Sequence, residues 1–351
     1  MSEQPSGSPE TPPAAAAAPE SPLLVRYSRR AMACEFAVLL DPVRYPHGAA
    51  AALAALNEVD RLEELLTVFR PESQISRINV LGYQQPVAVE PEVMEVLLLS
   101  KRLWEQTQGA FDITTGALSK AWGFFRRQGR MPQAAQLQAA LDRTGSHHLH
   151  LDPDSGTVRL AVPGVELNLG SIGKGYALDR AAVKLVEAGV QDFLFHGGRS
   201  SVLARGSQDP RDPQQGFWIG IAHPLQPDRR LARVRLRDAA LGTSGCGTQF
   251  FHHQGRRWAH VIDPRSGEPV QGVFSVTVRA PTAALADGLA TAFFVLGPEQ
   301  ARAFCRRRSE LALFMLVQGR GQSYRIVREN WPEEDLRLQE PFDRWVVREA
   351  E

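Results

Sequence analysis

The chain has 351 residues, of which 43% are hydrophobic and 23% are charged, and its formal net charge is +1. This balance is typical of a globular protein with enough apolar material for a sizeable core. A net charge near zero argues against a nucleic-acid groove or a polybasic membrane patch. The three cysteines, Cys34, Cys246 and Cys305, lie far apart, which argues against a disulfide framework or a cysteine-built zinc site.

The N-terminal segment carries no recognisable export signal. Residues 1–22 are rich in Pro, Ala, Ser, Glu and Gly, a composition that favours disorder, and they lack the charged start and apolar stretch of a signal peptide. Residues 31–34 read Ala-Met-Ala-Cys, like a lipoprotein cleavage site, but Arg29 and Arg30 stand where an apolar segment is required. No apolar run reaches the length that spans a bilayer. We therefore expect a cytoplasmic protein.

The first predicted elements follow from apolar periodicity. Residues 35–40 predict a largely buried strand. An amphipathic helix follows, because apolar residues recur at three- and four-residue steps at Leu53, Leu56, Val59, Leu62 and Leu66. Pro91 is expected at the first position of a second helix, and residues 126–147 are polar enough for a surface excursion.

The second half of the chain mixes strands and helices without a regular βαβ period. A helix should begin by Tyr176 and stop at Gly189, and an apolar helix over 283–296 should end at Gly297-Pro298. Strands are expected at 158–162, 193–195, 217–221, 233–237, 273–279 and 311–317. This mixture predicts an α+β fold. We expect one folded domain over residues 23–340, between a disordered tail over 1–22 and a C-terminal tail over 341–351.

A glycine-rich turn at residues 170–175, Gly-Ser-Ile-Gly-Lys-Gly, lies between a predicted strand and a predicted helix. Backbone N–H groups in such a turn, the N-terminus of the following helix and the Lys174 cation would suit a phosphate group. The spacing fits neither a Walker A loop nor a Gly-x-Gly-x-x-Gly motif. A plain tight turn fits these residues equally well.

Two further segments offer reactive side chains. His260 is followed by Asp263 in a turn, so the acid could orient the imidazole as a general base; a turn in which Asp263 caps the backbone is the alternative. Asp287 and Thr291 are four residues apart and therefore share one face of an apolar helix. A carboxylate and a hydroxyl suit a hard cation with oxygen ligands, whereas pairing of Asp287 with an arginine is the alternative.

These segments occur in a characteristic order. Residues 31–36 are similar to a Met-Gly-Thr strand, and residues 69–79 to a Tyr-x-Pro-x-Ser-x-Ile-Ser-x-Ile-Asn segment. They are followed, over roughly residues 30–300, by matching segments at 109–112, 122–124, 170–179, 243–245, 260–264 and 286–291. In this order the segments resemble the ApbE family of FAD:protein FMN transferases.

The resemblance implies an α+β fold, ApbE-like and T-fold-like, of two closely joined subdomains with FAD held between them. It implies Mg²⁺-dependent transfer of FMN from FAD to a Thr or Ser hydroxyl of an acceptor flavoprotein, with release of AMP. The implied general base is His260, and the implied Mg²⁺ ligands are Ser171, Asp287 and Thr291. The implied FAD contacts are Met32, Phe69, Ala110, Phe111, Asp112, Asn168, Lys174 and Ile262.

The chain departs from the family pattern at several positions. Phe69 stands where the family often has Tyr, and Asn168 replaces an Asp before the glycine turn. Arg199 and Cys246 occupy usually acidic places, and Ala290 stands where several members carry a further Asp. Because the base and the two helix-borne ligands are retained, we expect activity with altered metal affinity.

Two other functions would use the same residues. A hydrolase would let water attack FAD and yield FMN and AMP, and it would need His260 and Mg²⁺ as the transferase does. A non-catalytic flavin-binding protein is the third possibility, suggested by the charge changes at Asn168 and Arg199.

Overall fold

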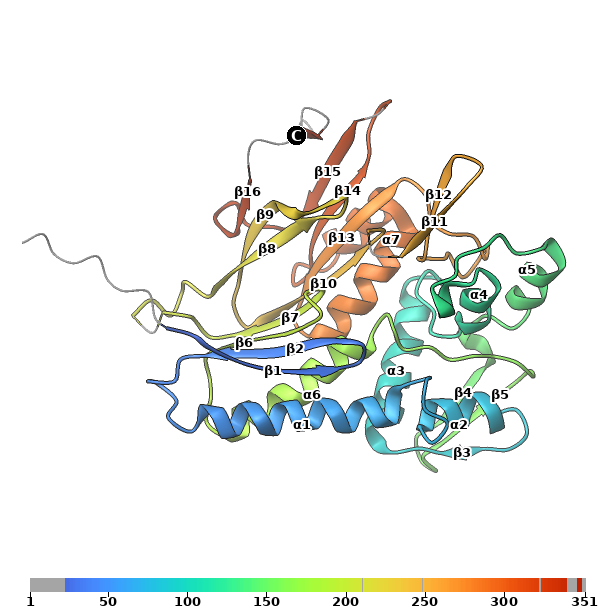
Figure 1. Ribbon diagram of the computed structural model, residues 1–351, viewed down its shortest axis with the longest axis horizontal. Helices are drawn as coiled ribbons and strands as arrows, with labels where there is room; N and C mark the ends of the chain where they lie inside the picture. Colours follow the sequence, from blue (N-terminus) through green and yellow to red (C-terminus); the bar gives the residue numbers. More distant parts are fainter. Residues whose placement is uncertain (1–22, 210, 248, 322, 340–345, 349–351) are drawn as a thin grey trace, which may run out of the picture.

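The computed structural model describes residues 23–339, apart from residues 210, 248 and 322, and also residues 346–348. The tail predicted over 1–22 lies outside the described residues, as do 341–345 and 349–351 of the predicted C-terminal tail. A large mixed sheet forms the centre of the molecule, with helices on one face and a smaller sheet on the other (Figure 1).

The main sheet has nine strands in the order β1-β2-β6-β7-β10-β13-β14-β15-β17. Neighbouring strands are antiparallel except β15 and β17, which are parallel. The strands are β1 (Val25–Ala31), β2 (Cys34–Leu40), β6 (Phe193–Gly197), β7 (Ser201–Arg205), β10 (Ala239–Gly245), β13 (Val273–Ala280), β14 (Ala312–Gln318), β15 (Tyr324–Glu329) and β17 (Val346–Arg348).

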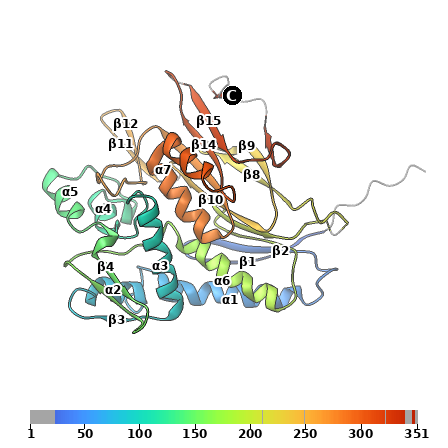
Figure 2. The ribbon, with the colours of Figure 1, turned by 180° about the vertical axis from the view of Figure 1, so that it is seen from behind.

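Helices α1 (Gly48–Leu66), α6 (Gly173–Glu187) and α7 (Ala283–Arg306) cover one face of this sheet (Figures 1 and 2). The other face is covered, over its second half, by a sheet of β8 (Phe217–His223), β9 (Gln226–Leu236) and β16 (Leu336–Leu338). Because both faces of β14 are covered, Leu313 and Met315 pack in the cluster with the helices, whereas Phe314 and Leu316 pack in the cluster with the small sheet. An unbroken apolar run is the result of this two-sided burial.

The remaining elements lie beside the helical layer (Figure 1). Their helices are α2 (Gln74–Leu81), α3 (Pro91–Gln106), α4 (Gly116–Ala121) and α5 (Ala134–Leu141). A sheet of β3 (Val87–Ala88), β5 (Thr157–Leu160) and β4 (Leu149–Asp152) packs near α2 and α3. A hairpin of β11 (Phe250–His253) and β12 (Arg256–Ala259) shares an aromatic cluster around Trp122 with α4 and α5.

The structure confirms the predicted α+β class, and each predicted strand and helix is present. It adds elements that were not predicted, among them β1, β7, β10 and β15, and it differs from the prediction in three details. Leu53 is 49% exposed, because small residues such as Ala52 and Ala55 fill the inner face of the first turns of α1. Residues 126–147 contain helix α5, held by a capping box between Gln133 and Gln136 that apolar periodicity does not register. Gly297 adopts φ 75°, so α7 kinks there and then continues.

Among the described residues, every helix is too short or too polar to cross a bilayer.

Candidate active site

The position of α7 depends on two glycines that let backbones meet. A Cβ added to Gly242 of β10 would lie 2.3 Å from the carbonyl carbon of Ala286, and one added to Gly175 of α6 would lie 2.1 Å from the carbonyl oxygen of Ala283. Both neighbours are backbone atoms, so neither can rotate away. These two close approaches place the turn of α7 that carries Asp287 between the main sheet and the N-terminus of α6.

We expect Gly242→Ala to lower the free energy of unfolding by about 1–3 kcal/mol, because the added methyl must push α7 away from β10. Gly245→Ala on the same strand is the matched control, since its Cβ would lie 3.5 Å from its nearest neighbour, in ordinary contact. Urea denaturation of the two variants measures the difference. Equal stabilities would show that the sheet and α7 do not depend on this contact.

Asp287 is buried, with 6% exposure, and its carboxylate makes three hydrogen bonds. The Ser201 hydroxyl lies 2.8 Å from both Oδ1 and Oδ2, and the Gly175 N–H donates to Oδ2 at 2.8 Å. Burial raises the pKa of Asp287 to about 6, against the opposing effects of the Lys174 charge and these hydrogen bonds. The carboxylate is therefore ionised at pH 7, inside a pocket of donors.

The glycine-rich turn precedes α6 as predicted, but it uses most of its own N–H groups. Gly170 donates to Oδ1 of Asn168 at 2.9 Å, and Gly173 donates to the carbonyl of Leu169 at 2.7 Å. The backbone amides of Ser171 and Lys174 have no hydrogen-bond acceptor in the described part of the chain. The Asp287 carboxylate is the negative group at this helix N-terminus. The two unused amides remain able to donate to a second negative group.

Lys174 links Asp287 to His260. Burial lowers the pKa of His260 and raises the pKa of Asp287 and of Cys34; the Lys174 charge adds to the first shift and opposes the other two. Gly198 supports the arrangement, since a Cβ at that position would lie 3.0 Å from the Cβ of Cys34 and 4.0 Å from the Cδ of Lys174. The hydrogen bond from the Gly175 N–H brings Asp287 of α7 to the N-terminus of α6, where Lys174 lies, and the Lys174 charge also acts on His260 in the segment after β12.

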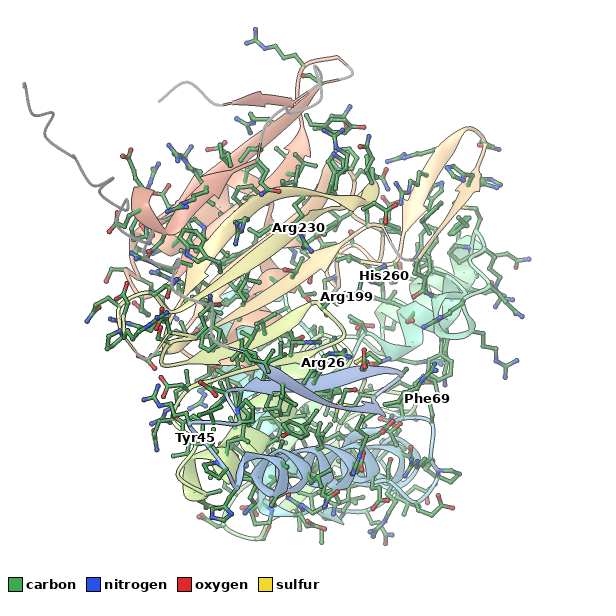
Figure 3. The ribbon with its side chains drawn as sticks, turned by 60° about the vertical axis from the view of Figure 1, so that its left-hand side comes forward. Arg26, Tyr45, Phe69, Arg199, Arg230 and His260 are labelled. Carbon is green, nitrogen blue, oxygen red and sulfur yellow. The ribbon has the colours of Figure 1, made fainter. Side chains whose placement is uncertain are left out.

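His260 lies where the chain leaves the β11–β12 hairpin (Figure 3). Its Nδ1 is 3.3 Å from the carbonyl oxygen of Gln249. A carbonyl only accepts, so the neutral ring carries its proton on Nδ1 and keeps the Nε2 lone pair free. Burial, followed by the Lys174 charge, lowers the pKa of His260 and keeps the ring neutral at pH 7.

Of the two interpretations of Asp263, orientation of His260 is wrong and backbone capping is confirmed, because the Arg265 N–H donates to Oδ1 of Asp263 at 2.9 Å. The Asp263 carboxylate pairs with Arg265, whose Nε and Nη2 lie 2.9 and 2.8 Å from its two oxygens. The sequence shows the acid three residues away, but it cannot show that the chain turns it toward Arg265. The partner of His260 is instead the backbone carbonyl of Gln249, and a backbone partner cannot be predicted from residue type.

The predicted metal ligands are partly assembled. The Thr291 hydroxyl lies on the Asp287 face of α7, 2.9 Å from Oγ of Ser244 and 3.4 Å from the carbonyl of Asp287. Ser171 is half-buried in the turn before α6. No cluster of three His, Cys, Asp or Glu side chains occurs among the described residues. An all-oxygen set with one carboxylate fits a hard cation that takes further ligands from a bound phosphate.

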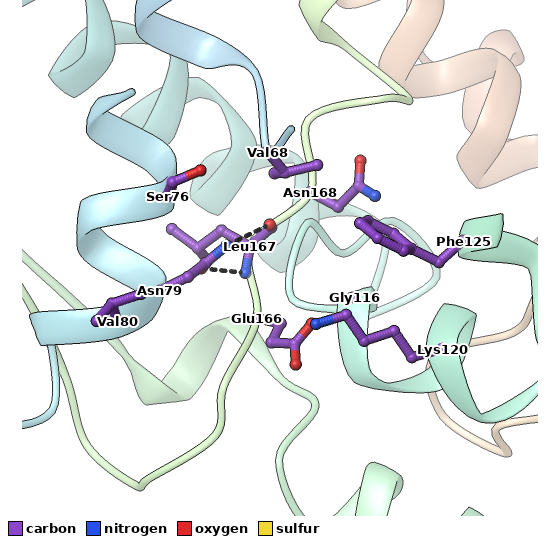
Figure 4. A pocket seen from close by; sticks show the side chains of 10 residues that line it. All are labelled: Val68, Ser76, Asn79, Val80, Gly116, Lys120, Phe125, Glu166, Leu167 and Asn168. Atoms are coloured by element: carbon purple, nitrogen blue, oxygen red, sulfur yellow. Dashed lines mark hydrogen bonds and ion pairs between the residues drawn. The ribbon is translucent and has the colours of Figure 1, made fainter. Parts of the chain in front are cut away.

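A cavity of about 260 Å³ lies next to Asn168, just before the glycine-rich turn, and is also lined by Phe125, Lys120 and Glu166 among others (Figure 4). The Lys120 ammonium is 2.6 Å from Glu166 and 5.3 Å from the centre of the Phe125 ring. Asn79 fixes the wall, because its amide side chain donates to and accepts from the backbone of Leu167 at 3.0 and 2.7 Å. Aromatic and polar groups therefore line one hollow.

Phe69 stacks on Phe125, with ring centres 5.2 Å apart and planes at 27°. Phe69 is 71% exposed, which is unusual for a large apolar ring and leaves its outer face open. Asn168 lines the hollow and Phe69 stacks on Phe125, one of its lining residues, while the segment 168–174 leads from the hollow to Lys174.

The other residues assigned to FAD lie in different surroundings. Met32 is half-buried in the β1–β2 turn and, with Ala33, adopts positive φ, 48° and 59°. Backbone strain of this kind, in residues other than glycine, often occurs at functional sites. The side chains of Ala110, Phe111 and Ile262 are buried in apolar clusters, so any contact with FAD would come from their backbone.

Asp112 is fully engaged within the protein. Its carboxylate accepts hydrogen bonds from the amides and hydroxyls of Thr114 and Ser146 at 2.7–2.9 Å, which joins two loops. Sequence analysis missed several residues whose contacts also join distant parts of the chain. Ser201 contacts Asp287, Gln249 contacts His260, and Phe125 stacks on Phe69. Asp179 caps the N-terminus of α7 by accepting from the amides of Ala283 and Ala284.

Comparison with known proteins identifies the family that this chain resembles. Residues 32–315 match the model of the ApbE family. The chain is 33% identical over 267 residues to an FAD:protein FMN transferase of Klebsiella pneumoniae strain 342, covering 74% of this chain and 75% of the relative. It is 31% identical over 274 residues to the FAD:protein FMN transferase of Escherichia coli K12, covering 76% of each chain.

Solved structures agree with the fold. The crystal structure of the ApbE protein of Thermotoga maritima superposes with a TM-score of 0.76 at 26% identity, covering 88% of this chain and 97% of that chain. The flavin transferase ApbE of Vibrio cholerae superposes with a TM-score of 0.74 at 25% identity, with the same coverage.

Proposed function

This chain belongs to the ApbE family, and from that premise we propose that it transfers FMN from FAD, with Mg²⁺, to a Thr or Ser hydroxyl of an acceptor flavoprotein. The observation that carries the proposal is the convergence of a neutral histidine, a lysine and a buried carboxylate at the N-terminus of α6. A base, a cation and a metal ligand in one place are what attack on a diphosphate requires.

His260 is the proposed general base. The Gln249 carbonyl holds Nδ1, so Nε2 takes the proton from the acceptor hydroxyl. The hydroxyl oxygen attacks the phosphorus on the FMN side, the bond from that phosphorus to the bridging oxygen breaks, and AMP leaves. The Lys174 ammonium group and the free amides of Ser171 and Lys174 would hold the phosphate oxygens.

Asp287 and Thr291, with Ser171, are the proposed metal ligands. Mg²⁺ bound there would neutralise charge on the diphosphate oxygens. The fit rests on the oxygen-only donor set and on the burial of an ionised carboxylate beside the Lys174 charge. Because Asp287 is the single carboxylate of this set, we expect weak metal binding until FAD supplies further oxygens.

The cavity beside Phe125 is the proposed place for one ring system of FAD. The exposed face of Phe69 and the hollow of about 260 Å³ offer stacking and partial enclosure to a flat aromatic group. The segment 168–174 joins this hollow to the diphosphate site, so one molecule with a ring and a diphosphate would occupy both.

FAD should therefore bind more tightly than FMN or NAD. FMN lacks the diphosphate that Lys174 and the metal ligands need, and NAD lacks the flavin ring. Fluorescence titration of the protein with each ligand, in the presence of Mg²⁺, measures the three Kd values. An FMN affinity equal to that of FAD would contradict a site built around the diphosphate.

A further inference from the structure

Ser201 is a fully buried residue at the start of β7, with 0% exposure. Its hydroxyl lies 2.8 Å from each carboxylate oxygen of Asp287. A hydroxyl has one proton to donate, so here it is shared between the two oxygens and lies on the axis of the carboxylate group. The Gly175 N–H, also at 2.8 Å, donates to Oδ2 from a second direction. Two donors from different elements thus fix the orientation of one carboxylate.

The placement of Ser201 follows from the register of the main sheet. Ser201 is paired with Gly242 of β10. Residues directly opposite each other in an antiparallel pair point to the same face, and Gly242 is the residue whose missing Cβ admits the backbone of Ala286 and Asp287. The pair therefore forms a floor under this turn of α7: Gly242 gives the backbone room, and Ser201 meets the side chain.

A carboxylate buried to this degree needs hydrogen bonds, and its orientation decides whether it can also bind a cation. Oδ2 accepts from both Ser201 and Gly175, whereas Oδ1 accepts from Ser201 alone. Oδ1 therefore keeps more lone-pair capacity for a further partner. Groups that hold a metal ligand in this way typically raise metal affinity by about 10–100-fold.

We infer that Ser201 is a positioning residue: it holds the Asp287 carboxylate in the orientation that binds the divalent cation. This inference rests on the proposed function, because it takes Asp287 as a metal ligand. The role assigned to Ser201 is exerted through Asp287, the side chain that its hydroxyl contacts.

The test is direct metal binding, with Mn²⁺ as the probe. Free Mn²⁺ is measured by electron paramagnetic resonance during titration of the FAD-bound protein without an acceptor. Ser201→Ala should weaken Mn²⁺ binding by about tenfold or more, because the carboxylate loses a donor. Ser201→Thr keeps the hydroxyl and should restore most of the affinity.

Ser275→Ala is the matched control. Ser275 is also a buried serine of the main sheet, with 2% exposure, and its hydroxyl has no hydrogen-bond partner in the structure. This variant should bind Mn²⁺ as the wild type does. Thermal unfolding is recorded for every variant, and Ser201→Cys, which retains a weak donor of similar size, replaces Ser201→Ala if the alanine variant does not fold.

Asp287→Asn separates failure of this inference from failure of the proposed function. Weak Mn²⁺ binding by Asp287→Asn with normal binding by Ser201→Ala would overturn the positioning role and leave the metal site standing. Normal binding by both variants would overturn the metal site as well. Equal loss in Ser201→Ala and Ser275→Ala would also contradict the inference, since any buried hydroxyl would then serve.

Discussion

His260→Ala is expected to lower the rate of FMN transfer by about 10²–10⁴-fold while the Kd for FAD stays nearly unchanged. The imidazole takes a proton in the transition state and contributes little to ground-state binding, so kcat falls more than affinity. Single-turnover kinetics with FAD and an acceptor measures the rate, and fluorescence titration measures the Kd. Because burial lowers the pKa of His260, the wild type should stay active below the usual titration range of histidine.

His253→Ala is the control for this prediction. His253 is an exposed histidine at the end of β11, on the hairpin that leads to His260, and should be replaceable without loss of rate. Near-normal turnover of His260→Ala would make His260 a structural residue of the turn and require another base.

Asp287→Asn should reduce Mg²⁺-dependent transfer by about 100-fold or more at low Mg²⁺, since charge stabilisation by a bound metal is worth several kcal/mol. The amide keeps an oxygen that can accept from Gly175, so the loss reports mainly on charge. Transfer is measured as a function of Mg²⁺ concentration, and partial rescue at high Mg²⁺ is expected.

Thr291→Val provides the comparison for Asp287→Asn. The Thr291 hydroxyl offers a dipole and is shared with Ser244, so its loss should cost less. An unchanged Mg²⁺ response of Asp287→Asn would make Asp287 a structural carboxylate, which only accepts hydrogen bonds from Ser201 and Gly175.

Periodicity and local motifs predicted the α+β class, four strands of the main sheet and its three covering helices. Of the main sheet, strands β2, β6, β13 and β14 were predicted, and β14 shows why: burial on both faces leaves a long apolar run. Strands β1, β7, β10 and β15 were not predicted. The inner face of α1 was misread at Leu53, because alanines that pack closely carry the same burial with less apolar signal. Helix α5 was missed because glutamine caps define its start and only Ala140 of its eight residues is buried.

The candidate site was predictable only where one segment held the information. Asp287 and Thr291 share a helix face, and Lys174 lies at a helix start, so sequence spacing placed them. The contacts that complete the site join residues far apart in sequence: Ser201 with Asp287, and Gln249 with His260. These partners depend on strand register and on a backbone carbonyl, and neither leaves a signal in a single sequence.

The central claim is that the FMN-side phosphorus moves from FAD to a protein hydroxyl. Mass spectrometry after incubation with FAD, Mg²⁺ and a panel of polypeptides with accessible Thr or Ser tests it most directly. The account predicts a covalent adduct with the mass of FMN less one water, an equal amount of AMP, and neither product with His260→Ala. Free FMN and AMP without any adduct would make the protein a hydrolase, and unchanged FAD would make it a flavin-binding protein; either result would contradict the account.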